Sequence, residues 1–449
     1  MSPPVVFLGA AGQMCEIVVQ RFAQATGNPL VLTDINIGPV EKLRDSLPAG
    51  RATSQRLDIF DPSALLEVIK GAALVVLAAG PYTRTSKPVI SACLEAKVPY
   101  LDFDDDVEST LAALDLDETA KKAGIPCYIG CGASPGMSNV MVVDATRGLD
   151  TVDGIDVCWL VGHGKAGAGK AVLEHLMHIS AGPCLTWVGG KPVLNETYLE
   201  TGYAPMIGDT EMLLHETAHP EPVTLPRLFP NATRIKCLGG LHPPTKWGFA
   251  RGLGAAVRRG ALPMADAVDF QYNARLGKVS PNVWIQMLRD YLERVPGVEI
   301  ANPEISQRVQ QAARSRGPWD HALNGMIEQV HNGECTKEEV ADYLISVIGG
   351  GGPETINGLL VRAIGTRNGH PAVVTKRTPT VGIDSYLLRS MATLTGTSCA
   401  AFALMALNNT QAKNGVFSPE DWAEPSAFYE ALRAVGTPAE ELVEDYSHC

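Results

Sequence analysis

The sequence predicts an α/β fold built on a doubly wound parallel sheet, and three observations predict it. The chain opens with an apolar run, a glycine-containing turn and a segment of helical periodicity. Apolar runs and helix-period segments then alternate, with short links, to about residue 129. The apolar runs are continuous rather than alternating, as in strands that are buried on both faces.

Composition and length narrow the class of protein. A chain of 449 residues predicts at least two domains, and 45% hydrophobic with 19% charged residues is typical of globular proteins. A formal net charge of -12 argues against a nucleic-acid surface. No stretch approaches eighteen uninterrupted apolar residues, so we expect no membrane span.

The ten cysteines show no CxxC and no paired metal spacing, and the opening run leads into a glycine turn without a basic region before it. We therefore expect free thiols in a reducing cytoplasm, no signal peptide and no metal.

The first unit predicts a nucleotide-binding turn. Residues 4–8 are expected to form a buried strand and residues 15–25 a helix. Between them, backbone N–H groups and a helix N-terminus can hold a pyrophosphate. The expected cofactor-binding residues of this turn are Gly9, Ala11, Gly12, Gln13 and Met14. Met14 stands where the usual fingerprint has its third glycine.

The second strand, residues 29–33, ends on Asp34. A carboxylate there accepts hydrogen bonds from the ribose hydroxyls of NAD and repels a 2′-phosphate. No Arg follows at once, so NAD is favoured over NADP as the cofactor. The alternative is that Asp34 only caps the next helix.

The alternation continues with a strand at 56–59, a helix at 62–70 that Asp61 can cap, and a central strand at 72–79. The expected later elements are helices 87–96 and 107–123 and strands 99–103 and 126–129. Because ligands of open α/β sheets lie at the carboxyl ends of strands, the cofactor site should also include Asp58, Ala79, Gly80 and Pro81.

Several motifs together resemble the saccharopine dehydrogenase family. They are the run 75–79 with Gly-Pro-Tyr, the segment 88–96, Tyr100-Leu-Asp, Gly130 to Asn139, 391–401, 414–420 and 428–432. The resemblance covers roughly residues 4–145 and 355–435. It implies a Rossmann domain at 1–145 and an inserted α+β domain for substrate binding and dimerisation at 146–355. It implies further that residues 356–449 complete that domain and return to the first.

The resemblance also implies a chemistry. Members of the family oxidise or form C–N bonds of amino acids and polyamine precursors through an imine, with a nicotinamide cofactor. This chain departs from the saccharopine enzymes at Ser134-Pro135-Gly136, where they carry Asp-Pro-Gly, and Ser cannot act as a carboxylate base. A carboxylate could come instead from Asp102, Asp104, Asp105 or Asp106; the alternative is that this run is a solvated turn and helix cap.

The middle of the chain offers further candidates for substrate binding. The loop 162–170 combines glycines with His163 and Lys170, and it lacks the Ser or Thr of a triphosphate-binding loop. Strands are expected at 154–161 and 184–188, with a helix at 170–179. The segment 239–251 resembles the family's His-Pro segment and brings together His242, Lys246 and Arg251, which could hold a carboxylate; the alternative is a turn and helix with solvated cations.

The remaining segments are predicted to form additional helices, after which the chain returns toward the first domain. Helices are expected at 283–294, 303–315, 320–331 and 337–347, with a capping box from Thr336 to Glu339. A glycine-rich break at 349–353 precedes a hairpin over 358–374 that turns at Asn368-Gly369.

The predicted reaction is hydride transfer between an amine-bearing carbon and nicotinamide C4, with a protein acid–base group near the nitrogen. The catalytic candidates, in order, are Tyr82, Asp104, His242 and Cys131. The expected substrate-binding residues are Tyr82, Ser134, Gly136, Met137, Asn139, His163, Lys170, Lys246 and Arg251.

The expected partners are a small amino-acid or amine substrate and a second copy of the chain, in the cytoplasm. Three alternatives stay open: an enzyme that recycles NAD internally, as homospermidine synthase does, a reductase of C=C or C=O bonds, and a nucleotide sensor without catalysis. NAD binding without turnover would favour the sensor.

Overall fold

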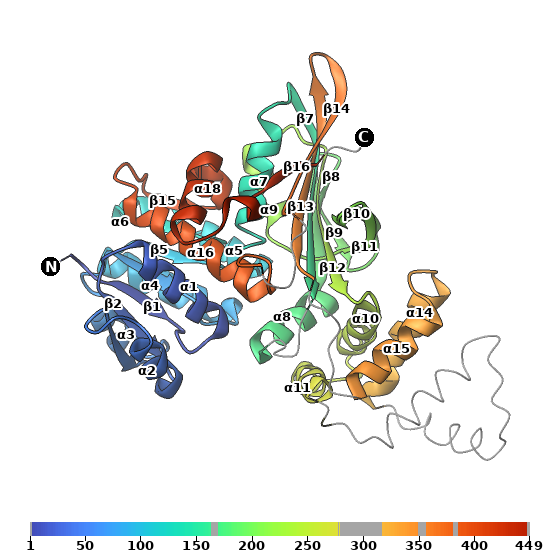
Figure 1. The fold of residues 1–449 in the computed structure, drawn as a ribbon, viewed down its shortest axis with the longest axis horizontal. Coiled ribbons are helices and arrows are strands. Elements are labelled where there is room, and N and C mark those ends of the chain that lie inside the picture. The colour runs from blue at the N-terminus through green and yellow to red at the C-terminus, as the bar shows by residue number, and fades with distance from the viewer. Residues whose placement is uncertain are drawn as a thin grey trace.

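A computed structural model of the chain describes residues 2–162, 169–276, 278, 317–348, 356–379 and 385–446 (Figure 1). These residues form two sheets, each with its own helices, here called the first and second domains. Four sequence predictions lie outside the described residues: His163, the helices at 283–294 and 303–315, and the break at 349–353.

The first sheet confirms the doubly wound α/β prediction. Its order is β15-β6-β5-β4-β1-β2-β3, and every neighbouring pair is parallel. The strands are β1 (Val5–Leu8), β2 (Leu30–Asp34), β3 (Ala52–Arg56), β4 (Leu74–Leu77), β5 (Tyr100–Asp102), β6 (Pro126–Tyr128) and β15 (Gly415–Phe417). β1 and β4 are fully buried, as their unbroken apolar runs predict.

The helices between these strands are α1 (Gln13–Ala25), α2 (Ile37–Asp45), α3 (Pro62–Ile69), α4 (Tyr82–Ala96), α5 (Val107–Leu114) and α6 (Asp117–Ala123). Asp61 caps α3, accepting from the N–H groups of Ser63 and Ala64 at 3.1 Å. The helix expected at 107–123 is two helices. α4 begins at Tyr82, five residues earlier than predicted, and contains Pro88.

The third strand was predicted at 56–59 but lies at 52–56. β3 is an edge strand of the sheet, and four of its five residues, Thr-Ser-Gln-Arg, are polar, so no apolar run reveals it. The apolar residues that suggested a strand, Leu57 and Ile59, lie in the turn that follows.

The C-terminal segment returns to the first domain. β15 extends the first sheet beside β6, and α16 (Met391–Asn408) packs against α1 (Figure 1). α16 has the length and hydropathy of a membrane span, but 67% of its apolar window is buried in the protein. Within the described residues α16 is therefore a core helix.

The second sheet is mixed and runs in the order β10-β11-β12-β7-β13-β14-β16, with β8 pairing with β12 and β9. Its strands are β7 (Thr151–Gly162), β8 (Pro183–Val188), β9 (Lys191–Glu196), β10 (Thr201–Ile207), β11 (Thr210–Glu216), β12 (Arg234–His242), β13 (Gly358–Arg367), β14 (His370–Arg377) and β16 (Glu444–Tyr446). The predicted hairpin is confirmed: β13 and β14 pair around Asn368 and Gly369.

The other helices are α7 (Met137–Thr146), α8 (Lys170–Ala181), α9 (Glu221–Leu228), α10 (Thr245–Arg258), α11 (Met264–Arg275), α14 (Pro318–His331), α15 (Lys337–Ile348), α17 (Pro419–Trp422), α18 (Pro425–Ala434) and the 3₁₀ turn η1 (Ala439–Glu441). The capping box at α15 is confirmed, because Thr336 and Glu339 exchange hydrogen bonds of 2.7 and 3.1 Å.

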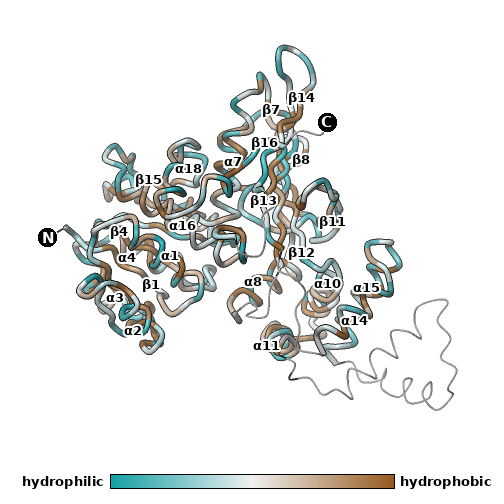
Figure 2. Tube along the Cα trace, in the orientation of Figure 1, coloured by the Kyte–Doolittle hydropathy of each residue, from teal (hydrophilic) through white to brown (hydrophobic). Residues whose placement is uncertain are grey.

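The main core joins the first sheet to one face of the second. Along β7, Val157, Trp159 and Val161 belong to this core, whereas Cys158 and Leu160 contribute to a small separate cluster on the opposite face. Apolar residues, brown in Figure 2, run along the strands and along α1 and α16. Trp159 therefore lies on the face of the second sheet that packs into the main core.

Candidate active site

The glycine turn after β1 has the geometry that a dinucleotide needs. Gly9 has a φ of +92°, and a Cβ on it would lie 2.7 Å from the backbone nitrogen of Ala79. Gly12 is the N-cap of α1 and supplies no side-chain cap to its N–H groups. The start of α1, including Gln13, can therefore present N–H groups to a pyrophosphate.

Asp34 lies beside this turn at the end of β2. Its Oδ2 accepts from Ala11 N at 3.2 Å and its Oδ1 from Asn36 N at 2.8 Å. The side chain is half-buried. Arg56, exposed at the end of β3, is its register partner on the neighbouring strand. The carboxylate and a guanidinium thus lie on adjacent strand ends where a ribose would bind.

The remaining expected cofactor residues follow β3 and β4. Asp58 is exposed, and its Oδ1 accepts from Phe60 N at 2.9 Å. Ala79, Gly80 and Pro81 lie at the carboxyl end of β4, next to Gly9. The structure brings these residues to one edge of the sheet.

Met14 stands where the usual fingerprint has its third glycine. The close packing of α1 against a neighbouring helix depends instead on a glycine of that helix. Gly396 of α16 lies against α1, where a Cβ on it would sit 2.8 Å from Ile17 Cβ and 2.9 Å from Met14 O. The small residue that this packing needs is therefore on α16.

The aspartates after β5 are mostly buried, which argues against a solvated turn. Asp102 accepts from the Tyr100 hydroxyl at 2.6 Å and from Gly130 N at 2.7 Å, and burial raises its pKa to about 6. Asp104 accepts from the Ser86 hydroxyl at 3.0 Å, and burial, with the nearby Asp102, raises its pKa well above the usual range.

Asp105 and Asp106 reach across the seam to His175 of α8. His175 Nδ1 lies 2.9 Å from Asp106 Oδ1, and Nε2 lies 3.5 Å from Asp105 Oδ2. Burial alone would lower the pKa of His175, but these carboxylates raise it to about 9. An imidazolium therefore joins the two domains at neutral pH.

A second histidine–carboxylate pair lies close by, at the start of α9. His219 Nδ1 is 2.9 Å from Glu221 Oε2, and Glu221 Oε1 accepts from the Ser134 hydroxyl and, at 3.1 Å, from the Ser138 hydroxyl. Glu221 is fully buried and His219 is 4% exposed. The two histidine rings are 6.1 Å apart. The sequence analysis did not single out His175, His219 or Glu221.

Trp159 forms one side of this site. Its ring lies 5.7 Å from the His219 ring, and it covers Gly239 of β12, where a Cβ would be 2.3 Å from the indole. Gly239 thus makes room for an aromatic ring beside His219. Such a ring can bind a cation through its π face.

Tyr82 and Cys131 are buried near the aspartates. The Tyr82 hydroxyl has no hydrogen-bond partner among the described residues, and its ring meets Phe103 edge-on at 5.8 Å. Burial, then Asp102, raises its pKa, so the hydroxyl keeps its proton. The Cys131 thiol lies 3.7 Å from Ile129 O, and burial raises its pKa well above the usual range.

Residues 134–139 connect the site to the C-terminal segment. Gly136 has a φ of +133°, and a Cβ on it would lie 1.9 Å from Gly132 O. Asn139 accepts from Gly136 N at 2.9 Å and donates to Glu420 at 2.8 Å. Met137 is fully buried, and its sulfur accepts a hydrogen bond from the Ser398 hydroxyl at 3.6 Å.

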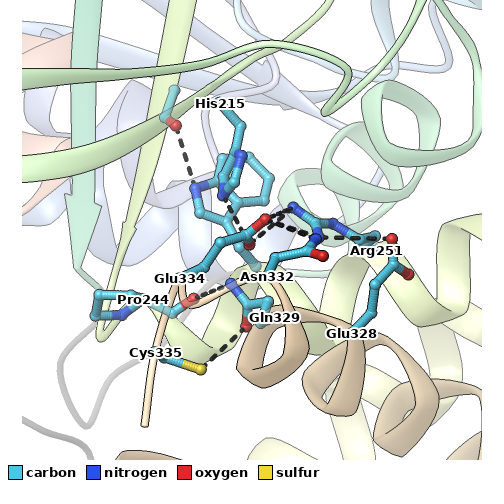
Figure 3. Close-up of polar contacts among 10 residues, drawn as sticks. His215, Pro244, Arg251, Glu328, Gln329, Asn332, Glu334 and Cys335 are labelled. Atoms are coloured by element: carbon cyan, nitrogen blue, oxygen red, sulfur yellow. Dashed lines mark hydrogen bonds and ion pairs between the residues drawn. The ribbon is translucent and has the colours of Figure 1, made fainter.

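The cations of the middle segment have protein partners. Lys170 pairs with Asp269 at 2.6 Å, and Lys246 donates to His242 O at 2.7 Å, with burial lowering its pKa to about 8. Arg251 binds Glu334 at 3.0 to 3.2 Å (Figure 3). These contacts do not join Lys170 and Arg251 to the His175–His219 group.

The Arg251 cluster holds α10 against α14. Figure 3 shows Arg251 between Glu334 and Glu328, with His215 above; His215 Nε2 is 3.6 Å from Glu334 Oε2. Burial, then Arg251, lowers the pKa of His215 to about 3. Arg251, a predicted substrate-binding residue, is thus part of a buried cluster that stabilises the fold.

Comparisons with known proteins agree with this geometry. Residues 5–127 match the saccharopine dehydrogenase NADP binding domain. The carboxyaminopropylagmatine dehydrogenase of Synechocystis sp. is 25% identical over 173 residues, 36% of this chain and 43% of that protein. Apo saccharopine dehydrogenase (L-Glu forming) from Saccharomyces cerevisiae has a similar fold, with a TM-score of 0.60 at 15% identity over 96% of this chain and 97% of that one.

The matched domain, the fold and the cofactor turn lead to the same assignment. The first domain is an NAD(P)-binding domain, and the two-sheet architecture is that of the structural neighbour. Residues 5–127 are thus similar to the saccharopine dehydrogenase NADP binding domain, and the chain as a whole has the fold of the yeast saccharopine dehydrogenase structure.

Proposed function

We propose that this protein is a dehydrogenase that oxidises, or forms, the C–N bond of an amino acid, an opine or a polyamine precursor. Hydride transfer would pass through an imine of the substrate. The related Synechocystis protein is named as a dehydrogenase of carboxyaminopropylagmatine, a carboxylated amine.

The observation that carries the proposal is the group of carboxylates at the carboxyl edge of the first sheet. Asp105 and Asp106 follow β5 and share one imidazolium, His175, so the two carboxylates bring one more negative charge than this partner neutralises. With the Trp159 ring beside the neighbouring His219, this surplus negative charge suits a cationic amine. An alcohol or an alkene would gain nothing from such charges.

The protein's own groups divide the work around that amine. Gly9 and the start of α1 would hold the pyrophosphate, and the strand ends after β4 would position the nicotinamide. The bound nicotinamide supplies the hydride chemistry. The Tyr82 hydroxyl, which has no hydrogen-bond partner among the described residues, would donate a hydrogen bond to the substrate.

We further propose that NAD is preferred over NADP. The Asp34 carboxylate is held by hydrogen bonds from Ala11 N and Asn36 N, and it would accept hydrogen bonds from the ribose of a bound NAD. A 2′-phosphate would meet its negative charge. Arg56 on the adjacent strand end is the group that could offset this repulsion.

The test is absorbance at 340 nm with NAD and with NADP, in both directions, across amino acids, diamines, opines and carboxylated polyamines including carboxyaminopropylagmatine. A signal with one amine, or with its carbonyl and amine pair, supports C–N oxidoreduction. NAD binding without any signal would contradict the proposal and favour internal cofactor recycling or a sensor.

A further inference from the structure

The Glu221 carboxylate is saturated by donors in the interior. Its Oε1 accepts from Ser134 and Ser138, and its Oε2 faces His219 Nδ1. Although burial would raise the pKa of Glu221, His219 and Ser134 hold it below its usual range. A buried carboxylate with these three partners is an anion, and each of its oxygens has at least one partner.

This arrangement fixes the proton of the neighbouring imidazole. Because Glu221 is an acceptor, His219 carries a hydrogen on Nδ1, and in the neutral ring Nε2 then holds the lone pair. Carboxylate–histidine pairs of this kind orient the ring and stabilise its protonated form. Nε2 is on the side of the ring away from the carboxylate.

The surroundings of His219 come from both domains. His175 of α8 meets it edge-on at 6.1 Å, and Asp105 and Asp106 interact with it electrostatically. Trp159 of β7 and Cys237 of β12 complete the set, the thiol keeping its proton because burial, then Glu221, raises its pKa. His219 thus lies at the seam, beside the aspartates that follow β5.

We infer that His219, held by Glu221, is the acid–base residue of the reaction proposed above, on which this inference rests. His219 Nε2 takes one proton from the substrate ammonium, which frees the nitrogen lone pair. The C–H bond then breaks as the C=N bond forms, and its hydrogen and two electrons pass to the oxidised nicotinamide. The proton stays on His219, as an imidazolium paired with Glu221, until it is released to water.

A metal ion is the competing use of the same side chains. Ligand atoms of His219, Glu221 and Cys237 lie within 4.8 Å of one another. The geometry favours the hydrogen-bonded pair, because Nδ1 and Oε2 are in direct contact at 2.9 Å and the Glu221 Oε1 already accepts from two hydroxyls.

The test compares His219→Asn and Glu221→Gln with His178→Asn. His178 is a matched control because it pairs with Glu108 at 3.1 Å on the same seam but is 38% exposed. NAD affinity, measured by nucleotide fluorescence, should be unchanged in all three. With the amine that the wild type oxidises, kcat should fall about 10²- to 10⁴-fold in His219→Asn and should stay the same in His178→Asn.

The pH profile separates catalysis from structure. The acidic limb of kcat/KM should disappear in His219→Asn, because the variant lacks the group that takes the proton. Imidazole ¹⁵N NMR of the wild type should show the hydrogen on Nδ1 at pH 8, a reading that needs no substrate.

Each contrary result would overturn a different claim. A wild type that oxidises no amine overturns the proposed function and this role with it. An active wild type whose pH profile is unchanged in His219→Asn, or a hydrogen on Nε2, overturns the role of His219 alone. One equivalent of divalent metal in the purified wild type, lost in Glu221→Gln, overturns it in favour of a metal site.

Discussion

His175 of α8 and Asp106 after β5 join the two domains: the imidazole Nδ1 lies 2.9 Å from the carboxylate Oδ1. The contact ties the α8 end of the second domain to the acidic turn of the first. Because the imidazole can lose its proton, the strength of this contact between the domains depends on pH.

The first prediction concerns this pair. Because the folded pKa of His175 is raised to about 9 from about 6.5, its contribution to stability is full below pH 6.5 and is lost as the pH rises through 9. His175→Asn should lower the free energy of unfolding by about 1–3 kcal/mol at pH 6. Urea titrations from pH 6 to 10 should show the difference from wild type shrinking between about pH 6.5 and 9 and staying small above pH 9; a constant difference would contradict this account.

Cofactor choice gives the second prediction. Asp34→Ala should raise the Kd for NAD about 10- to 100-fold, the loss of a hydrogen bond to a charged group, and should leave NADP binding unchanged or improved. Fluorescence titration with each nucleotide measures this.

The paired variant Arg56→Ala tests the neighbouring strand end. It should weaken NADP binding about tenfold and spare NAD, because only NADP offers a 2′-phosphate to the guanidinium. Equal effects of Asp34→Ala on the two nucleotides would remove the proposed preference.

Helix packing gives the third prediction. Gly396→Ala places a Cβ 2.8 Å from Ile17 Cβ and should destabilise the protein by about 1–3 kcal/mol through overpacking. Gly38→Ala in α2 is the control, since a Cβ there meets nothing within 4 Å and alanine favours a helix. Thermal melting of both variants decides; equal melting temperatures would show that α1 and α16 have room to separate.

The fourth prediction concerns Glu420, which accepts from Asn139. Burial, then Asp421, raises the pKa of Glu420 from 4.5 to about 7. Ionisation of this buried carboxyl therefore destabilises the fold as the pH rises from 4.5 through 7. Glu420→Gln should therefore be more stable than the wild type at pH 8 and similar to it at pH 5. Chemical denaturation at the two pH values measures this, and greater relative stability at pH 5 would be the contrary result.

The sequence predicted the first domain well, because its signals are local. The turn at Gly9 and Gly12, the carboxylate at Asp34 and the apolar run of β4 each lie within a few residues. The edge strand β3 was misplaced because its residues are polar, and α4 began early because the segment from Tyr82 to Lys87 has no apolar stripe.

The site across the seam could not be predicted from the sequence in the same way. Asp106 and His175 are 69 residues apart, and Ser134 and Glu221 are 87 apart, so only the packing of the two domains brings them together. The one local signal was the spacing His219-x-Glu221, which is common at helix starts. Arg251 and Lys246 looked available in the sequence, but Glu334 and the His242 carbonyl bind them.

The central claim is oxidation at a C–N bond, and one comparison tests it most directly. The rate of absorbance increase at 340 nm is measured with NAD and a carboxylated amine such as carboxyaminopropylagmatine, and again with the same compound acylated at the reacting nitrogen. The account predicts nicotinamide reduction with the free amine and none with the acylated compound, whose nitrogen lone pair cannot form the imine. Equal rates, or no reduction with any free amine, would contradict it.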